Sequence, residues 1–170
     1  MTIESILFYV LSAGAVGSAL FVVSRRNPVV AALWLIFNFF CLAGLYLSLH
    51  AQFIAVIQII VYAGAIMVLF LFVIMLLNLG DERRLVEGVT PRKVVGGILS
   101  IAVLVELWYV FLGTPSIQHA ALGNRATEIG TVEHIGAQLF TKFLLPFEVT
   151  SLLLTAAIVG AIVLAKRKLD

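Results

Sequence analysis

Long apolar runs separated by short polar segments dominate this chain. The runs cover about residues 3–23, 29–49, 53–79, 94–113 and 145–165. Each approaches or exceeds the roughly 20 apolar residues that a helix needs to cross about 30 Å of hydrocarbon. The pattern therefore predicts an all-α integral membrane protein, with five transmembrane helices in one membrane domain that covers residues 1–170.

The connections between the runs carry helix-start signals. Pro28 follows Asn27 and suits the first turn of a helix, where its missing N–H is not needed. Thr90 and Pro91 precede the fourth run in the same way, as an N-cap and a first-turn proline. These signals predict a tight turn between the first two helices and a helix start near residue 91.

One long connection, residues 114–144, separates the fourth run from the fifth. Within it Ile135, Leu139, Phe140 and Phe143 recur at helical spacing, and Thr131 precedes them as a candidate cap. The pattern predicts a short amphipathic helix that lies at the membrane surface.

Charged residues make up 12% of the chain, against about 25% in soluble domains. Most of the basic residues gather at alternate ends of the runs: Arg25, Arg26, Arg83, Arg84, Arg92, Lys93, Lys166, Arg167 and Lys168. By the positive-inside rule the amino terminus lies outside and the carboxyl terminus in the cytoplasm. No basic stripe with interleaved aromatics is present, so no nucleic-acid partner is expected.

Motifs for bound cofactors are missing from the sequence. It has no CxxC, no HExxH, no phosphate loop and no Ser/His/Asp set. His50 stands at the end of a run with no intramembrane histidine to oppose it in haem ligation, and the lone Cys41 reads as a small hydrophobe. We expect no catalytic residue, metal or cofactor in this chain.

Two carboxylates fall inside the runs. A charged side chain at the centre of a membrane helix costs on the order of 2.5–3.5 kcal/mol and often marks an ion path. For Glu106 a neutral or paired carboxyl is the favoured interpretation. For Glu148, near the start of the fifth run after Pro146, structural pairing and a proton path are equally supported.

The third run holds polar and small residues where leucines would suffice for anchoring. Gln58 and Tyr62 are four residues apart, and Gly64 stands between Ala63 and Ala65. As one helix the run would be about 40 Å long, so a tilt or a π-bulge could absorb the excess. Gly64 is where a bulge meets least steric resistance, although close helix packing is the commoner reason for such a glycine.

At this stretch the sequence resembles a known family. QIIVYAGAIMVLFLFVIMLLNL is very similar to the third transmembrane helix of subunit J of bacterial respiratory complex I, whose mitochondrial counterpart is NADH dehydrogenase subunit 6. The resemblance extends through RNPVVAALWLIFNF and LLPFEVTSLLLTAAIVGAIVLAKR.

The resemblance implies a π-bulge between Tyr62 and Val68 whose conversion to α-helix opens or closes a water wire for proton translocation. The gating or proton-path residues would be Gln58, Tyr62, Gly64, Met67, Val68 and Glu148. FMN and iron–sulfur clusters would belong to partner subunits. The partners would be membrane subunits similar to A, H, K and N together with lipids, in a bacterial inner (plasma) membrane rather than a mitochondrial one.

Two other functions compete with this interpretation. A small proton- or cation-coupled secondary transporter would use Glu106 or Glu148 as its ion site, but the inverted repeat typical of such transporters is not visible. A passive assembly scaffold would need neither carboxylate.

Overall fold

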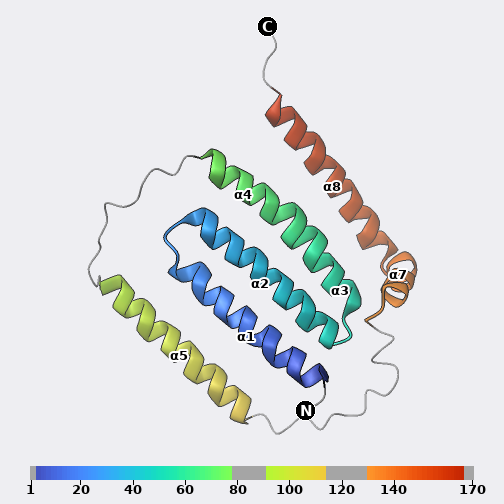
Figure 1. Cartoon of the computed structure of the whole chain (residues 1–170). Coiled ribbons are helices and arrows are strands. Elements are labelled where there is room, and N and C mark those ends of the chain that lie inside the picture. Colours follow the sequence, from blue (N-terminus) through green and yellow to red (C-terminus); the bar gives the residue numbers. More distant parts are fainter. Residues whose placement is uncertain (1–2, 78–90, 114–129, 167–170) are drawn as a thin grey trace.

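A computed structural model describes residues 3–77, 91–113 and 130–166, and every regular element in these ranges is a helix (Figure 1). Helices α1 (Ile3–Ser24) and α2 (Pro28–Ser48) form an antiparallel hairpin. The Asn27 side chain caps α2 by accepting hydrogen bonds from the N–H groups of Val29 (2.9 Å) and Val30 (3.3 Å). Pro28 occupies the first turn, as its position in the sequence predicts.

Small and polar side chains hold α1 against α2. The Asn38 amide donates to the Ala15 carbonyl at 2.7 Å and to the Ser18 hydroxyl at 3.0 Å. Ser18 is 2% exposed, and its hydroxyl donates to the Gly14 carbonyl at 2.7 Å. A Cβ on Gly14 would lie 3.0 Å from the Cys41 sulfur, so the missing side chain lets the two helices approach closely.

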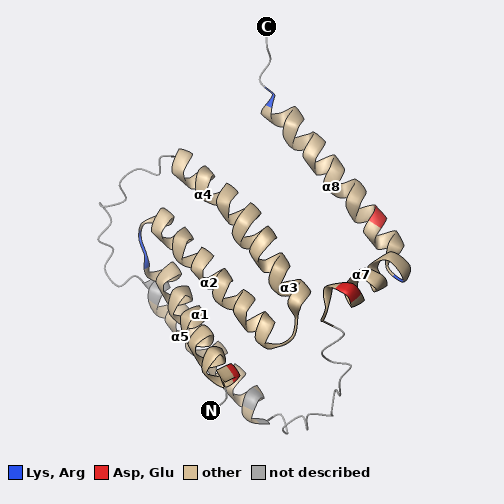
Figure 2. Ribbon diagram, turned by 45° about the vertical axis from the view of Figure 1, so that its right-hand side comes forward, with Lys and Arg blue, Asp and Glu red and all other residues tan. Residues whose placement is uncertain are grey.

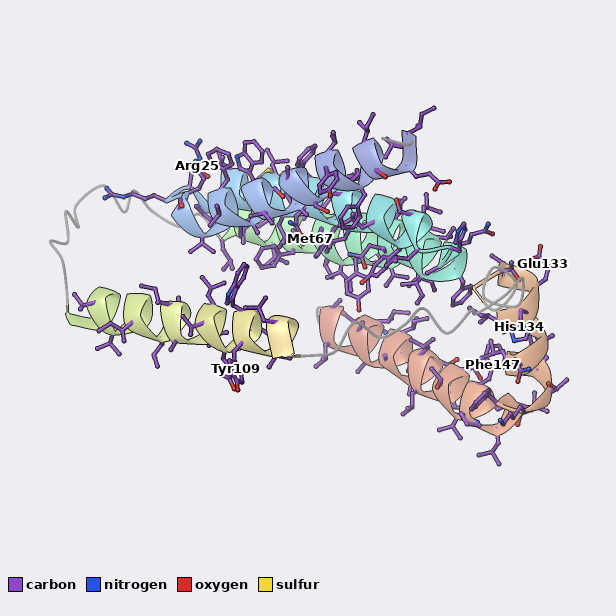
Figure 3. The ribbon with its side chains drawn as sticks, turned by 90° about the horizontal axis from the view of Figure 1, so that it is seen from below. Arg25, Met67, Tyr109, Glu133, His134 and Phe147 are labelled. Atoms are coloured by element: carbon purple, nitrogen blue, oxygen red, sulfur yellow. The ribbon has the colours of Figure 1, made fainter. Side chains whose placement is uncertain are left out.

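The third span lies along the other side of α2 (Figure 1). It consists of α3 (Gln52–Ile57), a π-helical segment η1 (Gln58–Ile66) and α4 (Met67–Leu76). Met67, which is labelled in Figure 3, and Ile74 pack against Ala32 of α2 in a small core. Four partly buried residues of α2 cover this core: Val29, Leu35, Ile36 and Phe39. Helix α2 is therefore the surface that both neighbours share.

Four helical stretches of the described chain are long and apolar enough to cross a membrane: α1, α2, the third span from Gln52 to Leu76, and α8 (Leu144–Ala165). Helix α5 (Pro91–Gly113) covers the fourth predicted span, but its described apolar stretch, Val94–Val110, is shorter. A membrane crossing by α5, the fourth of the five predicted spans, therefore stays a prediction. Within the described ranges α5 contacts no other helix, and Tyr109 points away from α1–α4 (Figure 3).

Helix α7 (Val132–Thr141) occupies the part of the long connection where an amphipathic helix was expected. The Thr131 side chain caps it by accepting a hydrogen bond from the His134 N–H at 3.3 Å. The Phe140 ring packs edge-on against the Phe147 ring of α8, with centroids 5.1 Å apart. Helix α7 also contacts α3, so it joins α8 to the third span.

Candidate functional site

The π-helical segment interrupts the third span near its middle. In a π-helix each N–H bonds to the carbonyl five residues earlier, and the N–H of Met67 at the end of η1 donates to the Tyr62 carbonyl in this way. Such segments are rare and frequently lie at functional sites. Its nine residues lie in the stretch that carries the family resemblance.

The spacing of the buried residues in the third span reflects the change from α-helix to π-helix. In this span Ala55, Gln58, Ala63 and Met67 are buried, at steps of three, five and four residues. An unbroken α-helix buries one face at steps of three or four, so the step of five marks the wider turn. Ala63 therefore faces the protein where an α-helix would place Tyr62. Sequence reasoning did not select Ala63, because its position depends on the helix type.

Gln58 is 7% exposed and is, with Ser18, one of two buried polar residues in the described part of the chain. A primary amide offers two donors and two acceptor sites, and burying it in hydrocarbon without partners costs several kcal/mol. The site therefore favours either a polar neighbour or water beside Gln58.

Tyr62 differs from Gln58 in its surroundings. Its side chain is 45% exposed, and its ring meets the Phe39 ring of α2 edge-on with centroids 5.8 Å apart. Two residues four apart would share a face of an α-helix, but in η1 one is buried and the other half-exposed. The Tyr62 side chain therefore lies at the edge of the interface between η1 and α2.

Gly64 is exposed, and a Cβ added to it would meet one atom within 4 Å, the Ile59 carbonyl oxygen at 3.2 Å. Close packing against another helix, the commoner reason for such a glycine, finds no partner among the described residues. The restriction at Gly64 instead comes from its own π-helical backbone. Beyond it, Met67 is 4% exposed and Val68 is 46% exposed.

Glu148 lies on α8, where its carbonyl accepts a hydrogen bond from the Ser151 hydroxyl at 2.7 Å. Helix α8 has no described contact with η1, so the structure does not bring Glu148 together with the candidate residues of the third span. Glu106 is exposed on α5. In the described ranges no three His, Cys, Asp or Glu residues are placed to hold a metal ion.

Comparison with known proteins gives one consistent result. Residues 18–164 match the family described as NADH-ubiquinone/plastoquinone oxidoreductase chain 6. The chain is 40% identical to NAD(P)H-quinone oxidoreductase subunit 6 of the Paulinella chromatophora chromatophore, over 98% of this chain and 80% of the relative. It is 40% identical to NADH-quinone oxidoreductase subunit J of Pseudomonas aeruginosa, covering 91% and 92% of the two chains. For subunit J of Rickettsia bellii the identity is 34%, covering 97% and 82%.

Proposed function

The chain belongs to the chain 6 (subunit J) family of NADH-quinone oxidoreductase, and from this membership and its π-helical segment we propose that it gates a water path for proton translocation. It is a membrane subunit of the proton-translocating enzyme, and it carries no redox centre of its own in this proposal. Its contribution is the coupling of quinone reduction to proton movement.

The observation that carries the proposal is η1 itself. Converting its π turn to α-helix shifts each hydrogen bond from the fifth preceding carbonyl to the fourth. The chain beyond the turn then rotates relative to the chain before it by about one residue's angle, roughly 100°. The two forms must lie within a few kcal/mol of each other for both to be populated.

The gate is an exchange of two side chains beside Gln58. In the π form Ala63 faces the protein, and in this proposal a water molecule occupies the space that its small methyl group does not fill beside the buried amide. In the α form the step from Gln58 becomes four residues, so Tyr62 takes that position with its bulky ring and hydroxyl. Gly64 permits the change because it has no Cβ to meet the Ile59 carbonyl. The same rotation moves Met67 to the direction that Val68 faces in the π form, and Ile66 takes the buried position of Met67.

The topology of the proposal has five crossings, an outer amino terminus and a cytoplasmic carboxyl terminus. Figure 2 shows basic residues at the α1–α2 turn and at the end of α8, a single further basic residue, Lys142, between α7 and α8, and acidic residues at the start of α1, in α7 and near the start of α8. This distribution supports the orientation, because basic residues favour the cytoplasmic side. The membrane is a bacterial plasma membrane, in keeping with the bacterial relatives.

The partners in this proposal are other membrane subunits, similar to subunits A, H, K and N, and surrounding lipids. Helix α8 has no buried residue in the described chain, and it carries Glu148 on an exposed surface. A carboxylate near the membrane interface is stabilised by a donor or by water, which a neighbouring subunit would supply there. FMN and iron–sulfur clusters belong to the other chains.

Co-purification tests this assignment. A tagged chain extracted from membranes in mild detergent should be recovered with flavin-, iron–sulfur- and quinone-binding chains and with NADH:quinone activity. A chain that is stable alone and moves protons across vesicle membranes without NADH would instead support a secondary transporter.

A further inference from the structure

Gly130, the residue before the Thr131 cap of α7, lies against the turn between α2 and α3. The N–H of Phe53, in the first turn of α3, donates to the Gly130 carbonyl at 3.4 Å. A Cβ on Gly130 would collide with the His50 carbonyl oxygen and lie 3.3 Å from the Ala51 Cα. Figure 3 shows α7, with Glu133 and His134, beside this end of α3. Two backbone segments far apart in the sequence therefore touch directly.

The α2–α3 turn is itself well held. The N–H of His50 donates to the Leu47 carbonyl at 3.0 Å, and the N–H of Ala51 donates to the Tyr46 carbonyl at 2.9 Å. His50 has a φ of 59°, a left-handed conformation that a non-glycine residue keeps only when its surroundings fix it. The first turn of α3 is thus bounded by this turn and by Gly130.

We propose that the contact of Gly130 with the α2–α3 turn anchors the α3 end of the third span, so that the conversion of η1 rotates α4 instead of α3. The inference rests on the proposed function. A change of helix type sets only the relative rotation of the two halves, and the half that is held stays in place. Gly130 is then a positioning residue for the gate.

The two halves of the span are held differently. Phe53 lies five residues before Gln58, about 7.5 Å along the helix, so the anchor is close to the start of η1. At that end the Gly130 backbone contacts the backbone of the α2–α3 turn, and rotation of α3 about its axis would break the hydrogen bond from the Phe53 N–H to the Gly130 carbonyl. Helix α4 meets α2 through the side chains of Met67, Ile74 and Ala32, and aliphatic side chains can repack after a rotation.

Glycine substitutions on either side of the α7 cap separate anchoring from general effects on α7. Gly130→Ala introduces the methyl group that the His50 carbonyl excludes, whereas at Gly136, inside α7, a Cβ would meet nothing within 4 Å. Gly136→Ala is therefore the matched control. Both variants are purified as the whole complex, and turnover is expressed per assembled complex by its flavin content.

With Gly130→Ala we expect NADH:quinone turnover and proton pumping to fall about tenfold, equivalent to about 1.4 kcal/mol, because the rotation is shared between α3 and α4. Hydrogen exchange at the Phe53 amide should accelerate, and cryo-EM during turnover should show α3 rotating. The wild type and Gly136→Ala should rotate α4 alone and keep full activity.

Three results would overturn the inference. In the first, Gly130→Ala lowers the yield of complex but leaves turnover per complex unchanged, which assigns Gly130 a role in assembly only. In the second, α3 rotates as much as α4 in the wild type, so no anchor exists although the gate does. In the third, neither half rotates in the wild type, and the proposed gate fails together with its anchor.

Discussion

Replacing Gly64 with valine is the sharpest perturbation of the π-helical segment. In the structure a Cβ at residue 64 lies 3.2 Å from the Ile59 carbonyl oxygen, which is tighter than most contacts that Cβ atoms make in proteins. In an α-helix the Ile59 carbonyl would instead accept a hydrogen bond from the N–H of residue 63, so the Cβ of residue 64 would no longer lie so close to that oxygen. The valine should therefore shift the equilibrium toward the α form.

The size of the shift follows from the crowding. Overpacking costs about 1–3 kcal/mol, and we take about 1.4 kcal/mol because a single atom lies within 4 Å of the added Cβ. That bias changes the ratio of the two forms about tenfold. If the π and α forms begin equally populated, the population of the π form falls from about one half to about one tenth. Because each catalytic cycle must pass through both forms, the turnover rate then falls about fivefold.

Three activities of the purified variant complex test this reasoning. NADH oxidation with an artificial acceptor should be unchanged, whereas quinone-linked turnover and proton pumping should both fall. Gly160→Val is the control, because a Cβ at that position in α8 would meet nothing within 4 Å in this chain. Unchanged turnover together with unchanged pumping per quinone reduced would refute the argument and place the gate elsewhere.

Further expectations concern topology, Glu148 and the α1–α2 contact. Reporter fusions should place the amino terminus outside and the carboxyl terminus in the cytoplasm, and a cytoplasmic amino terminus would reverse the assignment. Glu148→Gln keeps the shape and removes the charge, so pumping should fall in an assembled complex; normal pumping would leave Glu148 a structural role. Asn38→Ala removes the hydrogen bonds to Ala15 and Ser18. It should cost about 1–2 kcal/mol, seen as faster thermal inactivation of the complex, and an unchanged inactivation rate would contradict that value.

Much of the fold follows from the sequence because hydropathy and helix-start residues are local signals. Helices α1, α2 and α8 end within about a residue or two of the predicted spans, which is the usual uncertainty of helix boundaries. Pro28 and Thr131 occupy the first-turn and cap positions that were expected of them. The third span was expected to reach residue 79, but its last residues lie outside the described ranges.

The site depended on packing that the sequence does not display. Whether Ala63 or Tyr62 faces α2 is decided by one wider helical turn, and an apolar run with residues of either kind fits both registers. Gly64 suggested a close contact between helices, yet the atom that a Cβ at this position would approach is the Ile59 carbonyl oxygen of the same π-helical segment. Asn38 was not selected, although an amide inside a span is itself a signal for an interhelical hydrogen bond.

The contact at Gly130 was also beyond reach from the sequence. Nothing in the spacing of the long connection indicates that one of its glycines lies against His50 and Ala51, about eighty residues earlier in the chain. Such contacts depend on the path of the chain outside the membrane, which hydropathy does not encode.

The hydrogen-bond register of Gln58–Ile66 in the assembled complex tests the central claim most directly. Cryo-EM of the wild-type enzyme at rest and during turnover should resolve two forms. In one the Met67 N–H bonds to the Tyr62 carbonyl and Ala63 faces α2, as in this structure. In the other the Met67 N–H bonds to the Ala63 carbonyl, and Tyr62 takes the position beside Gln58. A single register in every state of the enzyme would contradict the proposed gate.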